Sequence, residues 1–440
     1  MEYNDLQLLA IRTALTAPVS VITGGPGTGK TTVLRGILDE MEAQGLHYRL
    51  CAPTGRAQKR MTEQTGRTAQ TIHRLLEWQG GRFGRDEDSP LLTDAVIVDE
   101  CSMIDLMLMQ ALLRAIQPGT RLILIGDNDQ LPSVGAGRVL GDIIDSGVVP
   151  VTRLTQIYRQ SDGSYITQNA RAIIRGRFED IHLDNRTSRD FFFLDVKSLM
   201  DAGEFADDPT VQTIDQAAQR KLIEKVSDGL PRYMPGREIQ VLTPTRQRGE
   251  CSTDTLNPLL QHALNPDGQP LDIAGYRLRR GDRVMQMRNN YALGAFNGDI
   301  GQVDGVGWVE KKRWRDTGDW ESNHTDDDRC MLVRYPDHPT ATPYDSDDLK
   351  DIDLAYASTI HKAQGSEYPI VVIMITPATA FMLNRNLLYT AVTRAKDLCL
   401  IIGDRQTLRL AVRKVSTDIR QTRLATRLRG ETDITDNTES

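Results

Sequence analysis

Residues 19–41 read VSVITGGPGTGKTTVLRGILDEM, and this stretch decides the fold of the first part of the chain. The apolar run VSVIT predicts a buried strand, and TTVLRGILDEM predicts a helix. Between them, residues 24–31 fit the pattern G-x-x-x-x-G-K-[S/T] of a phosphate-binding loop. Its glycines let backbone N–H groups turn toward phosphate oxygens, and the following helix N-terminus adds positive potential. The alternative is a chance glycine-rich turn, but the intact flanking strand and helix argue against it.

The loop offers ligands for ATP and for Mg²⁺. Lys30 can reach the β- and γ-phosphates, and the hydroxyl of Thr31 can hold Mg²⁺. The expected nucleotide contacts in this loop are Gly24, Gly25, Pro26, Gly27, Thr28, Gly29, Lys30, Thr31 and Thr32.

Further apolar runs that end in polar residues extend the pattern along the chain. They cover residues 47–54, 95–100, 121–127, 239–245, 369–376 and 398–404. Such runs are typical of parallel strands buried on both faces, and the segments between them are long enough for crossover helices. The fold class is therefore α/β, and ligands of such sheets bind at the carboxyl ends of the strands.

Asp99 and Glu100 directly follow the apolar run AVIV. We expect Asp99 to hold Mg²⁺ through water, and Glu100 to orient or deprotonate an attacking water. An acidic pair at a strand end is often only a helix cap. The upstream phosphate loop favours the hydrolytic role.

The length of 440 residues suggests about three structural units. Two sets of strands predict two parallel-sheet domains, with a helical connecting region and a Gly-, Asp- and Trp-rich β insertion. The expected ranges are 1–160 for the first, ATP-binding domain, 161–236 for the connecting region, 237–300 with 351–427 for the second domain, and 301–350 for the insertion. We expect residues 428–440 to be disordered, because the last ten carry no basic residue and little to bury.

Composition excludes several classes of protein. With 39% hydrophobic and 26% charged residues and a net charge of −7, the chain is neither collagen-like nor a highly charged disordered polymer. Apolar runs are too short to span a membrane, and the N-terminus does not resemble a secretory signal. Five scattered cysteines favour reduced, mostly buried thiols in a cytoplasmic protein. Residues 53–85 and 271–288 are locally basic, which alone favours a solvated face.

The chain resembles superfamily 1 DNA helicases, in the 5′→3′ branch (superfamily 1B) that includes the RecD-like and Dda-like enzymes. The resemblance rests on an ordered series of motifs from Asn4 to about Asp404, which is more specific than any one match. Beyond the phosphate loop these are NDLQLLA at 4–10, CAPTGRA at 51–57, TIHRL at 71–75, DECSM at 99–103, GDNDQLPSVG at 126–135, YRQ at 158–160, STIHKAQGSE at 358–367 and YTAVTRA at 389–395.

The resemblance implies two RecA-like domains with ATP between them. Gln7 would read adenine, and Gln130 would sense the γ-phosphate. Gly365 and Glu367 would contact the nucleotide, with Glu367 on the ribose; a solvated surface glutamate is the alternative for that residue. The first motif begins at Asn4, which favours a compact Dda-like arrangement over one with a long N-terminal extension.

Two arginines complete the implied catalytic machinery. Arg159 and Arg394 would approach the γ-phosphate when the cleft closes, and an arginine finger of this kind contributes roughly 10³–10⁵ in rate. The alternative for each is a structural ion pair. The implied catalytic residues are Lys30, Asp99, Glu100, Gln130, Arg159 and Arg394, and Thr31 and Asp99 are the metal ligands.

Single-stranded DNA is implied across both domains. Short hydroxyl and basic groups suit contacts with phosphates, which carry no sequence information. The first candidates are Pro53, Thr54, Arg56, His73, Ser133, Thr359 and His361, and a second set after IQVLTPT is Thr243, Thr245 and Arg246. For each hydroxyl the alternative is a capping or turn hydrogen bond.

Residues 77–92 lie where the family carries a β-hairpin pin that splits the duplex. Gly80–Gly81 is a turn signal, with Gly84 as an alternative. Trp78 and Phe83 are candidates for stacking on bases, although core packing is the commoner fate of an aromatic ring. The segment is short, so a blunt pin is compatible with it.

Residues 281–286 (GDRVMQ) and 296–301 (FNGDIG) also resemble the RecD branch, and they lead into the β insertion, which there is an SH3-like barrel over the DNA. Asn297 is therefore a further DNA candidate, against the alternative of a solvated loop.

The resemblance implies an ATP-dependent 5′→3′ DNA translocase and helicase acting in replication, recombination or repair. ATP and Mg²⁺ are the expected cofactors, and single-stranded and forked duplex DNA the expected partners. Single-strand-binding or replication proteins are further candidate partners. We expect a cytoplasmic monomer without membrane contact. The alternatives are a translocase without unwinding activity, a subunit of a larger complex without such activity, and RNA as the track.

Overall fold

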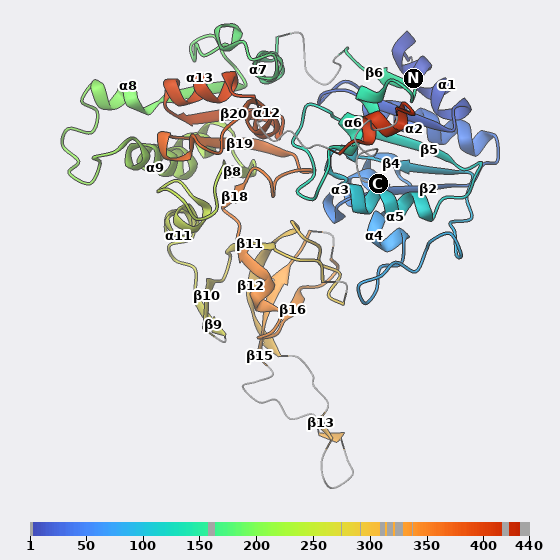
Figure 1. The fold of residues 1–440 in the computed structure, drawn as a ribbon. Helices are drawn as coiled ribbons and strands as arrows, with labels where there is room; N and C mark the ends of the chain where they lie inside the picture. Colours follow the sequence, from blue (N-terminus) through green and yellow to red (C-terminus); the bar gives the residue numbers. More distant parts are fainter. Residues whose placement is uncertain are drawn as a thin grey trace, which may run out of the picture. The chain divides into compact units, whose positions relative to one another are not determined.

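The computed structural model describes residues 3–156, 163–273, 275–290, 292–308, 313–314, 320–321, 329–336, 338–415 and 422–431. These residues form two compact units (Figure 1). The first unit comprises residues 1–181, 385–393 and 414–440, and the second comprises residues 182–384 and 394–413. No helix within the described ranges has the length and apolar character that a membrane crossing needs.

The first unit is built on a six-stranded parallel sheet with the strand order β3-β2-β4-β5-β1-β6. Its strands are β1 Val19–Thr23, β2 Tyr48–Ala52, β3 Ala69–Thr71, β4 Ala95–Val98, β5 Arg121–Gly126 and β6 Val151–Arg153. Its helices are α1 Asp5–Thr16, α2 Lys30–Ala43, α3 Gly55–Thr65, α4 Ile72–Leu75, α5 Leu106–Arg114, α6 Val139–Ser146, α7 Tyr165–Ile174, α12 Arg385–Val392 and α14 Leu424–Leu428.

Successive residues of these strands enter two different cores, because side chains of a strand alternate between the faces of the sheet. Ile22 packs with α1, α2 and α3 on one face, whereas Val21 packs with α4, α5 and α6 on the other. Ile97 and Val98 divide in the same way. Burial on both faces explains why these strands are continuous apolar runs in the sequence.

The second unit holds a five-stranded parallel sheet with the order β18-β8-β19-β20-β7. Its strands are β7 Phe191–Asp195, β8 Ile239–Thr243, β18 Ala357–Thr359, β19 Tyr368–Ile375 and β20 Ala395–Gly403. Its helices are α8 Val196–Asp201, α9 Ile214–Glu224, α10 Leu230–Tyr233, α11 Thr253–Leu264 and α13 Arg405–Arg413, with a π-helical turn at Lys225–Gly229.

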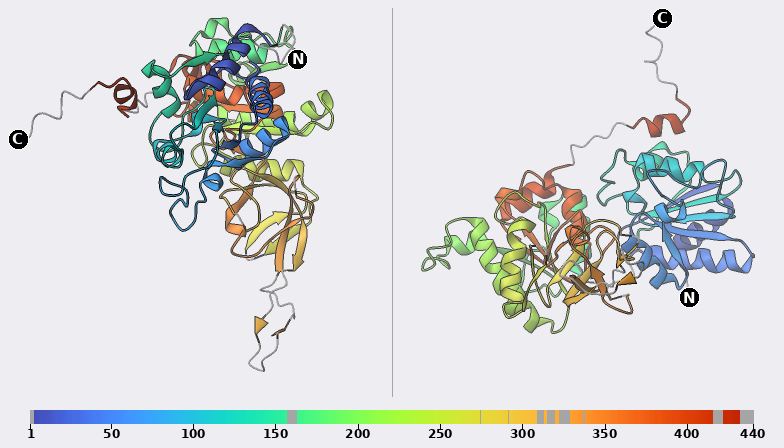
Figure 2. Two further views of the ribbon diagram at one scale, coloured as in Figure 1. Left: turned by 90° about the vertical axis from the view of Figure 1, so that its right-hand side faces the viewer. Right: turned by 90° about the horizontal axis from the view of Figure 1, so that it is seen from below.

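An antiparallel sheet forms a separate body within the second unit (Figures 1 and 2). Its order is β16-β15-β12-β11-β17. The strands are β11 Arg283–Gln286, β12 Ile300–Trp308, β15 Arg329–Arg334, β16 Thr342–Tyr344 and β17 Ile352–Leu354, and β9 Pro270–Ile273 pairs with β10 Tyr276–Arg279 beside them. It has its own core, which includes Val284, Val303, Met331 and Tyr344.

The structure confirms the predicted α/β class, with two parallel sheets and a β insertion in the second domain. Three boundaries differ from the expected ranges. The insertion's sheet runs from residue 283 to residue 354 rather than from 301 to 350, because strands β11 and β17 at its ends are only 4 and 3 residues long. Strands this short leave almost no periodic signal.

The other two differences concern segments assigned to the wrong neighbour in sequence. Strand β7 lies inside the expected helical connecting region and pairs with β20 at the edge of the second sheet. Helix α14 lies at the end of the expected second domain but contacts α6 of the first unit, with Leu424 packed on its core. All five cysteines are free and buried, as predicted.

Candidate nucleotide site and nucleic-acid interface

The predicted phosphate loop connects β1 to α2. Gly27 and Gly29 have φ values of 73° and 87°, a left-handed conformation that glycine adopts without steric cost. Thr28 Oγ1 donates a hydrogen bond of 2.8 Å to Gly25 O and closes the loop on itself. Because Gly29 is the N-cap of α2, the loop leads into a helix N-terminus, where N–H groups and the helix dipole favour phosphate.

Lys30 and Thr31 begin α2. Lys30 Nζ donates to Gly24 O at 2.6 Å and to Gly25 O at 3.0 Å, so the ammonium group lies against the loop in which phosphate is expected. Thr31 Oγ1 donates to Oε1 of Gln64 on α3 at 3.1 Å. The lone pairs of Thr31 Oγ1 remain available to a cation.

Asp99 and Glu100 follow β4, as predicted, but their backbones differ. Asp99 Oδ1 accepts from the N–H of Glu100 at 2.8 Å, and Glu100 has a φ of 53°, which is unusual for a residue with a Cβ atom. Glu100 forms an ion pair of 3.9 Å with Arg60 on α3. Burial and the charge of Glu100 raise the pKa of Asp99 to about 6, against the opposing charges of Lys30 and Arg60.

These groups fit Mg²⁺. The donor set is one hydroxyl and one carboxylate, both hard oxygen ligands of the kind that Mg²⁺ prefers. Burial destabilises the charged form of Asp99, and a bound cation would offset that cost.

Gln130 lies in the loop after β5 and is buried. Its Nε2 donates to Asp127 Oδ2 at 3.2 Å, and the hydroxyl of Tyr389 on α12 donates to the same oxygen at 2.8 Å. Nearby, the N–H of Leu131 donates to Thr390 Oγ1 at 3.0 Å. The loop GDNDQLPSVG and the motif YTAVTRA, more than 250 residues apart in the sequence, therefore meet within the first unit.

Lys30, Asp99, Glu100 and Gln130 follow three consecutive strands of the first sheet, in the order β4-β5-β1. The loops are joined directly, because the N–H of Gly24 donates to Gly126 O at 3.3 Å. The structure thus brings together the four predicted catalytic residues of the first unit. Arg159 and its motif lie outside the described residues.

The side chain of Gln7 takes part in a helix cap, a role that its motif did not predict. Asn4 caps α1, its side chain accepts from the N–H of Gln7 at 2.8 Å, and Gln7 Oε1 accepts from the N–H of Asn4 at 3.1 Å. This reciprocal arrangement is a capping box. The predicted adenine contact of Gln7 would therefore have to use Nε2, since Oε1 is engaged in the cap.

In the second unit, Arg394 lies two residues after the end of α12 and is buried, with 2% of its surface exposed. Its Nη1 donates to Ser366 O at 3.0 Å. Gly365 has a φ of 73° in the turn before Ser366. Glu367 is not a solvated glutamate, because its side chain is 6% exposed and lies 3.8 Å from Nζ of Lys396.

The DNA candidates of the first unit follow β2 and β3, the two strands at one edge of the sheet. Thr54 Oγ1 caps α3 by accepting from the N–H of Ala57, and Pro53 and Arg56 beside it are half-buried. Ser133 follows β5 instead, and its buried hydroxyl donates to Gly135 O at 3.1 Å. Ser133 therefore makes the turn hydrogen bond that was given as the alternative to a DNA contact.

His73, Trp78 and Phe83 form one aromatic cluster. The ring centroids of Trp78 and Phe83 are 4.5 Å apart, and each ring lies about 6 Å from that of His73. Burial lowers the pKa of His73. Phe83 packs against the core of the first unit, whereas Trp78 is 39% exposed. Only Trp78 of the two predicted stacking residues therefore has much accessible surface.

The expected hairpin has its turn at Gly80–Gly81, both with positive φ. Gln79 and Arg82 pair across it through hydrogen bonds of 2.9 Å and 3.2 Å. Within the described residues this is a single bridge rather than two extended strands. The hairpin is therefore short, and its role as a strand-separating pin stays a prediction.

The DNA candidates of the second unit also follow two neighbouring strands at a sheet edge, β18 and β8, in which Thr359 pairs with Thr243. Thr243 is fully buried and donates to Cys251 O, and Thr245 donates to Arg248 O at 2.7 Å. Both hydroxyls serve local turns. Arg246 is 57% exposed and lies 3.5–3.6 Å from Asp254 and Asp353.

His361 and Lys362 complete this edge. Burial lowers the pKa of His361 and, together with the charge of Arg246, that of Lys362. Lys362 Nζ donates to Asn297 Oδ1 at 2.7 Å. Asn297 therefore joins the β insertion to the candidate DNA edge of the parallel sheet.

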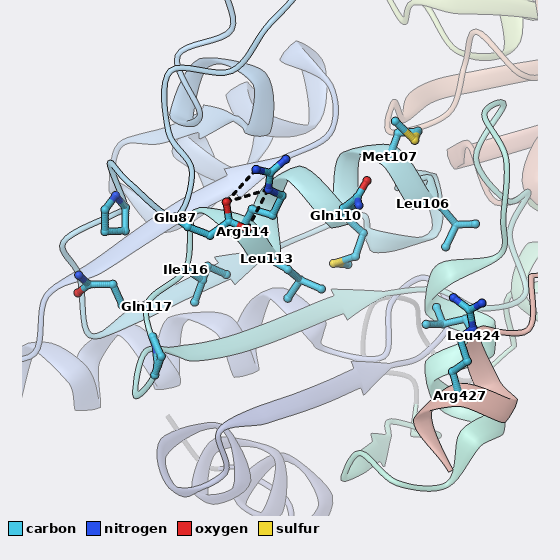
Figure 3. A pocket seen from close by; sticks show the side chains of 13 residues that line it. Glu87, Leu106, Met107, Gln110, Leu113, Arg114, Ile116, Gln117, Leu424 and Arg427 are labelled. Carbon is cyan, nitrogen blue, oxygen red and sulfur yellow. Dashed lines mark hydrogen bonds and ion pairs between the residues drawn. The ribbon is translucent and has the colours of Figure 1, made fainter. Parts of the chain in front are cut away.

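A separate hollow of about 800 Å³ lies beside α5. Figure 3 shows that Leu424 and Arg427 reach it from α14, whereas Arg114, paired with Glu87, comes from α5. None of the candidate nucleotide or DNA residues is among its described lining residues.

The contacts of several residues of the site were not predicted from the sequence. Arg60 and Gln64 carry no motif of their own, although their positions one helical turn apart are visible in the sequence. Asp127 and Tyr389 lie inside quoted motifs, but their contact spans 262 residues and has no local signal.

Three sequence families match the chain. Residues 7–136 match the AAA domain family, residues 256–317 the SH3 domain of ATP-dependent RecD-like DNA helicases, and residues 354–402 the UvrD-like helicase C-terminal domain. The ATP-dependent RecD2 DNA helicase of Deinococcus radiodurans is 36% identical over 93% of this chain and 50% of its own length. The RecBCD enzyme subunit RecD of Mycolicibacterium smegmatis is 30% identical over 96% of this chain and 74% of its own length.

This chain belongs to the RecD-like helicase family. The RecD subunit of Mycobacterium tuberculosis is 31% identical over 93% of this chain and 70% of its own length. A solved Pif1 helicase from Bacteroides, in complex with ADP-AlF3 and single-stranded DNA, has a TM-score of 0.49 and 16% identity, with 92% of each chain covered. The present chain spans only half the length of the Deinococcus RecD2 relative.

Proposed function

We propose that this RecD-like chain is a DNA helicase that couples ATP hydrolysis to 5′→3′ movement on single-stranded DNA and to separation of duplex DNA. The observation that carries the proposal is the grouping of Lys30, Asp99, Glu100 and Gln130 at the ends of three consecutive strands. A chain that only bound DNA would not need an acid–base residue beside a phosphate loop.

In the proposed reaction, Lys30 and the loop N–H groups bind the β- and γ-phosphates, and Thr31 and Asp99 hold Mg²⁺. Bound there, Mg²⁺ would supply positive charge that stabilises the phosphate oxygens. Glu100 takes a proton from the attacking water, whose oxygen forms the new bond to the γ-phosphorus as the bond to ADP breaks. Gln130 contacts the γ-phosphate, and its link to Asp127 and Tyr389 carries the loss of that contact to α12.

Arg394 and Arg159 are proposed to stabilise the transferred phosphoryl group in a closed state of the protein. Only Thr393 separates Arg394 from the end of α12, so movement of α12 would displace Arg394. Its hydrogen bond to Ser366 O must be exchanged for the phosphate in that state.

The proposed DNA track crosses the carboxyl ends of two edge strands in each unit, β2 and β3 in the first and β8 and β18 in the second. Arg56, Arg246 and His361 would contact phosphates, with Lys362 and Asn297 beside them. Trp78 would stack on a base at the fork.

A steady-state ATPase assay with and without single-stranded DNA tests the motor, and duplexes with only a 5′ or only a 3′ tail test the direction. We expect Mg²⁺-dependent ATPase activity that DNA stimulates, and displacement only from the 5′ tail. Equal stimulation by RNA would contradict the DNA preference, and displacement only from the 3′ tail would contradict the polarity.

The short pin favours one alternative, a translocase that moves along DNA without opening it. Its single bridge, Gln79–Arg82, offers little surface to hold two strands apart. Displacement of streptavidin from biotinylated single-stranded DNA, without displacement of a complementary strand, would support the translocase instead.

Further parts of the proposal concern context: a cytoplasmic monomer that acts in replication, recombination or repair and meets single-strand-binding or replication proteins. Elution at the mass of a larger species in size-exclusion chromatography with light scattering would contradict the monomer.

A further inference from the structure

One face of α3 runs from the candidate DNA contacts to the candidate metal ligand. Arg56, Arg60 and Gln64 follow one another at intervals of four residues, so they lie along the same side of the helix. Arg56 and Gln64 are eight positions apart, which in a helix corresponds to about 12 Å. Arg56 lies in the first turn, beside Thr54, which caps the helix.

Arg60, in the middle of this face, contacts Glu100. Arg60 Nη1 lies 3.9 Å from Glu100 Oε1, and the two side chains are 26% and 13% exposed. The ion pair holds the carboxylate of Glu100 beside α3, so the position of α3 restricts where that carboxylate can lie. In this arrangement Glu100, the proposed proton acceptor, is restrained by a helix whose other end is proposed to meet DNA.

Gln64, in the last turn of the same face, contacts Thr31 on α2. Gln64 Oε1 accepts from Thr31 Oγ1 at 3.1 Å, and Gln64 O accepts from Nε of Arg35 on α2 at 2.5 Å. Gln64 is therefore fixed to α2 by its backbone while its side chain sets the direction of the Thr31 hydroxyl. A hydroxyl that donates to Gln64 directs its lone pairs elsewhere, which suits a metal ligand.

We propose that α3 couples DNA binding to ATP hydrolysis, with Arg60 and Gln64 as positioning residues. Arg60 restrains Glu100 in the absence of DNA, and Gln64 orients Thr31 toward Mg²⁺. A DNA phosphate bound at Arg56 shifts the first turn of α3 and draws Arg60 away from Glu100, which then accepts the proton of the attacking water. This inference rests on the proposed function, because it needs both an ATPase and a DNA track.

The test of Arg60 is the ratio of ATPase rates with and without single-stranded DNA in the full chain. Arg60→Gln should raise the DNA-independent rate and keep the DNA-stimulated rate, so the stimulation ratio falls by at least about fivefold. Arg60→Lys keeps the charge and should retain most of the wild-type ratio. Arg114→Gln removes an arginine from another ion pair of the first unit and should leave the ratio unchanged.

Each other result of this experiment has a definite meaning. A wild-type enzyme without DNA stimulation would overturn the proposed function and this inference together. A stimulated wild type with an unchanged ratio in Arg60→Gln, or with both rates lowered equally, would overturn the inference alone. Thermal unfolding shows whether each variant is folded. If Arg60→Gln does not fold, the stimulation ratio of Arg60→Lys still tests whether the positive charge sets that ratio.

The test of Gln64 is the dependence of turnover on Mg²⁺. Gln64→Leu keeps a similar volume and removes the acceptor, so the Mg²⁺ concentration for half-maximal ATPase should rise by at least about fivefold. Binding of a fluorescent ATP analogue in EDTA should stay unchanged, because that contact involves no metal. An unchanged Mg²⁺ requirement, or an equal loss of binding in EDTA, would overturn the role of Gln64.

Discussion

Tyr389 donates a hydrogen bond of 2.8 Å to Asp127 Oδ2, the same oxygen that accepts from Gln130 Nε2 at 3.2 Å. One carboxylate oxygen thus joins helix α12 to the residue proposed to sense the γ-phosphate. All three side chains are buried, so the bonds are sheltered from competition with water. Helix α12 ends at Val392, two residues before Arg394, so this junction connects Gln130 to the helix that precedes the proposed arginine finger.

Tyr389→Phe removes one donor from this junction and keeps the ring. We expect the free energy of unfolding of the first unit to fall by about 1.5–3 kcal/mol, the usual net contribution of a hydrogen bond to a carboxylate. ATP should still bind, whereas DNA-stimulated turnover should fall. Urea unfolding and ATPase assays measure the two effects. Tyr233→Phe, at an exposed hydroxyl, is the matched control, and equal turnover in both variants would contradict a role for the junction.

Glu100→Gln should nearly abolish hydrolysis while ATP still binds, because the amide cannot accept the proton of the attacking water. General acid–base groups typically contribute about 10²–10⁴ in rate, so the ATPase rate should fall within that range. Lys30→Ala should lose binding as well, since Lys30 lies against the phosphate loop. Glu87→Gln, an exposed carboxylate on the same unit, is the control. Substantial turnover by Glu100→Gln would remove Glu100 from the proposed mechanism.

Arg246→Gln should weaken binding of single-stranded DNA, because Arg246 follows β8 at the proposed track and is 57% exposed. The slope of log affinity against log salt should also become shallower by about 1, as expected for one lost phosphate contact. Fluorescence anisotropy at several salt concentrations measures both. Arg237 has the same exposure and precedes β8 at the other end of the strand, so Arg237→Gln should change neither. Parallel losses in both variants would point to net charge alone.

The sequence predicted most of the central strands because burial on both faces makes them continuous apolar runs. It missed β3, β6, β7 and β18, three of which are only three residues long. β7 is apolar, FFFLD, but it lies between helical segments and its partner β20 is about 200 residues away in the sequence. Strands of this kind are defined by their neighbours in the sheet, and local periodicity does not contain that information.

The candidate site divides in a similar way. The phosphate loop and the Asp99–Glu100 pair were predictable, because each depends on a short segment with its own pattern. The pattern N-x-x-Q before an apolar run has two interpretations, a motif that reads adenine and a helix capping box. The structure shows the capping box at Asn4 and Gln7. Arg60 and Gln64 were not predictable, because their partners lie on other elements of the first unit.

Asp215→Asn should stabilise the protein above acidic pH. Asp215 is buried against Thr376 and near Glu250, and burial raises its pKa above the ordinary 3.8. An acid whose pKa is raised on folding contributes stability at low pH that is lost as the pH rises through the folded value. The amide introduced by Asp215→Asn does not titrate, so this variant does not lose this stability as the pH rises. The free energy of unfolding of Asp215→Asn should therefore exceed that of the wild type at pH 7, and the difference should vanish below about pH 3.8. Thermal unfolding between pH 3 and 8 measures it, and a constant difference across this range would contradict the assignment.

The two aromatic rings of the short pin should have separate roles. Phe83 packs on the core of the first unit, so Phe83→Ala should lower the free energy of unfolding by about 1–3 kcal/mol, less than a fully buried phenylalanine would. Trp78 is 39% exposed, so Trp78→Ala should cost less stability and act on the fork instead. We expect it to slow strand displacement while DNA-stimulated ATPase activity persists, because the DNA track of both sheets is unchanged. Trp78→Phe keeps a ring and should restore part of the displacement rate. Equal displacement by the wild type and Trp78→Ala would show that the chain opens duplex DNA without its pin, and loss of ATPase stimulation in Trp78→Ala would place Trp78 on the track rather than at the fork.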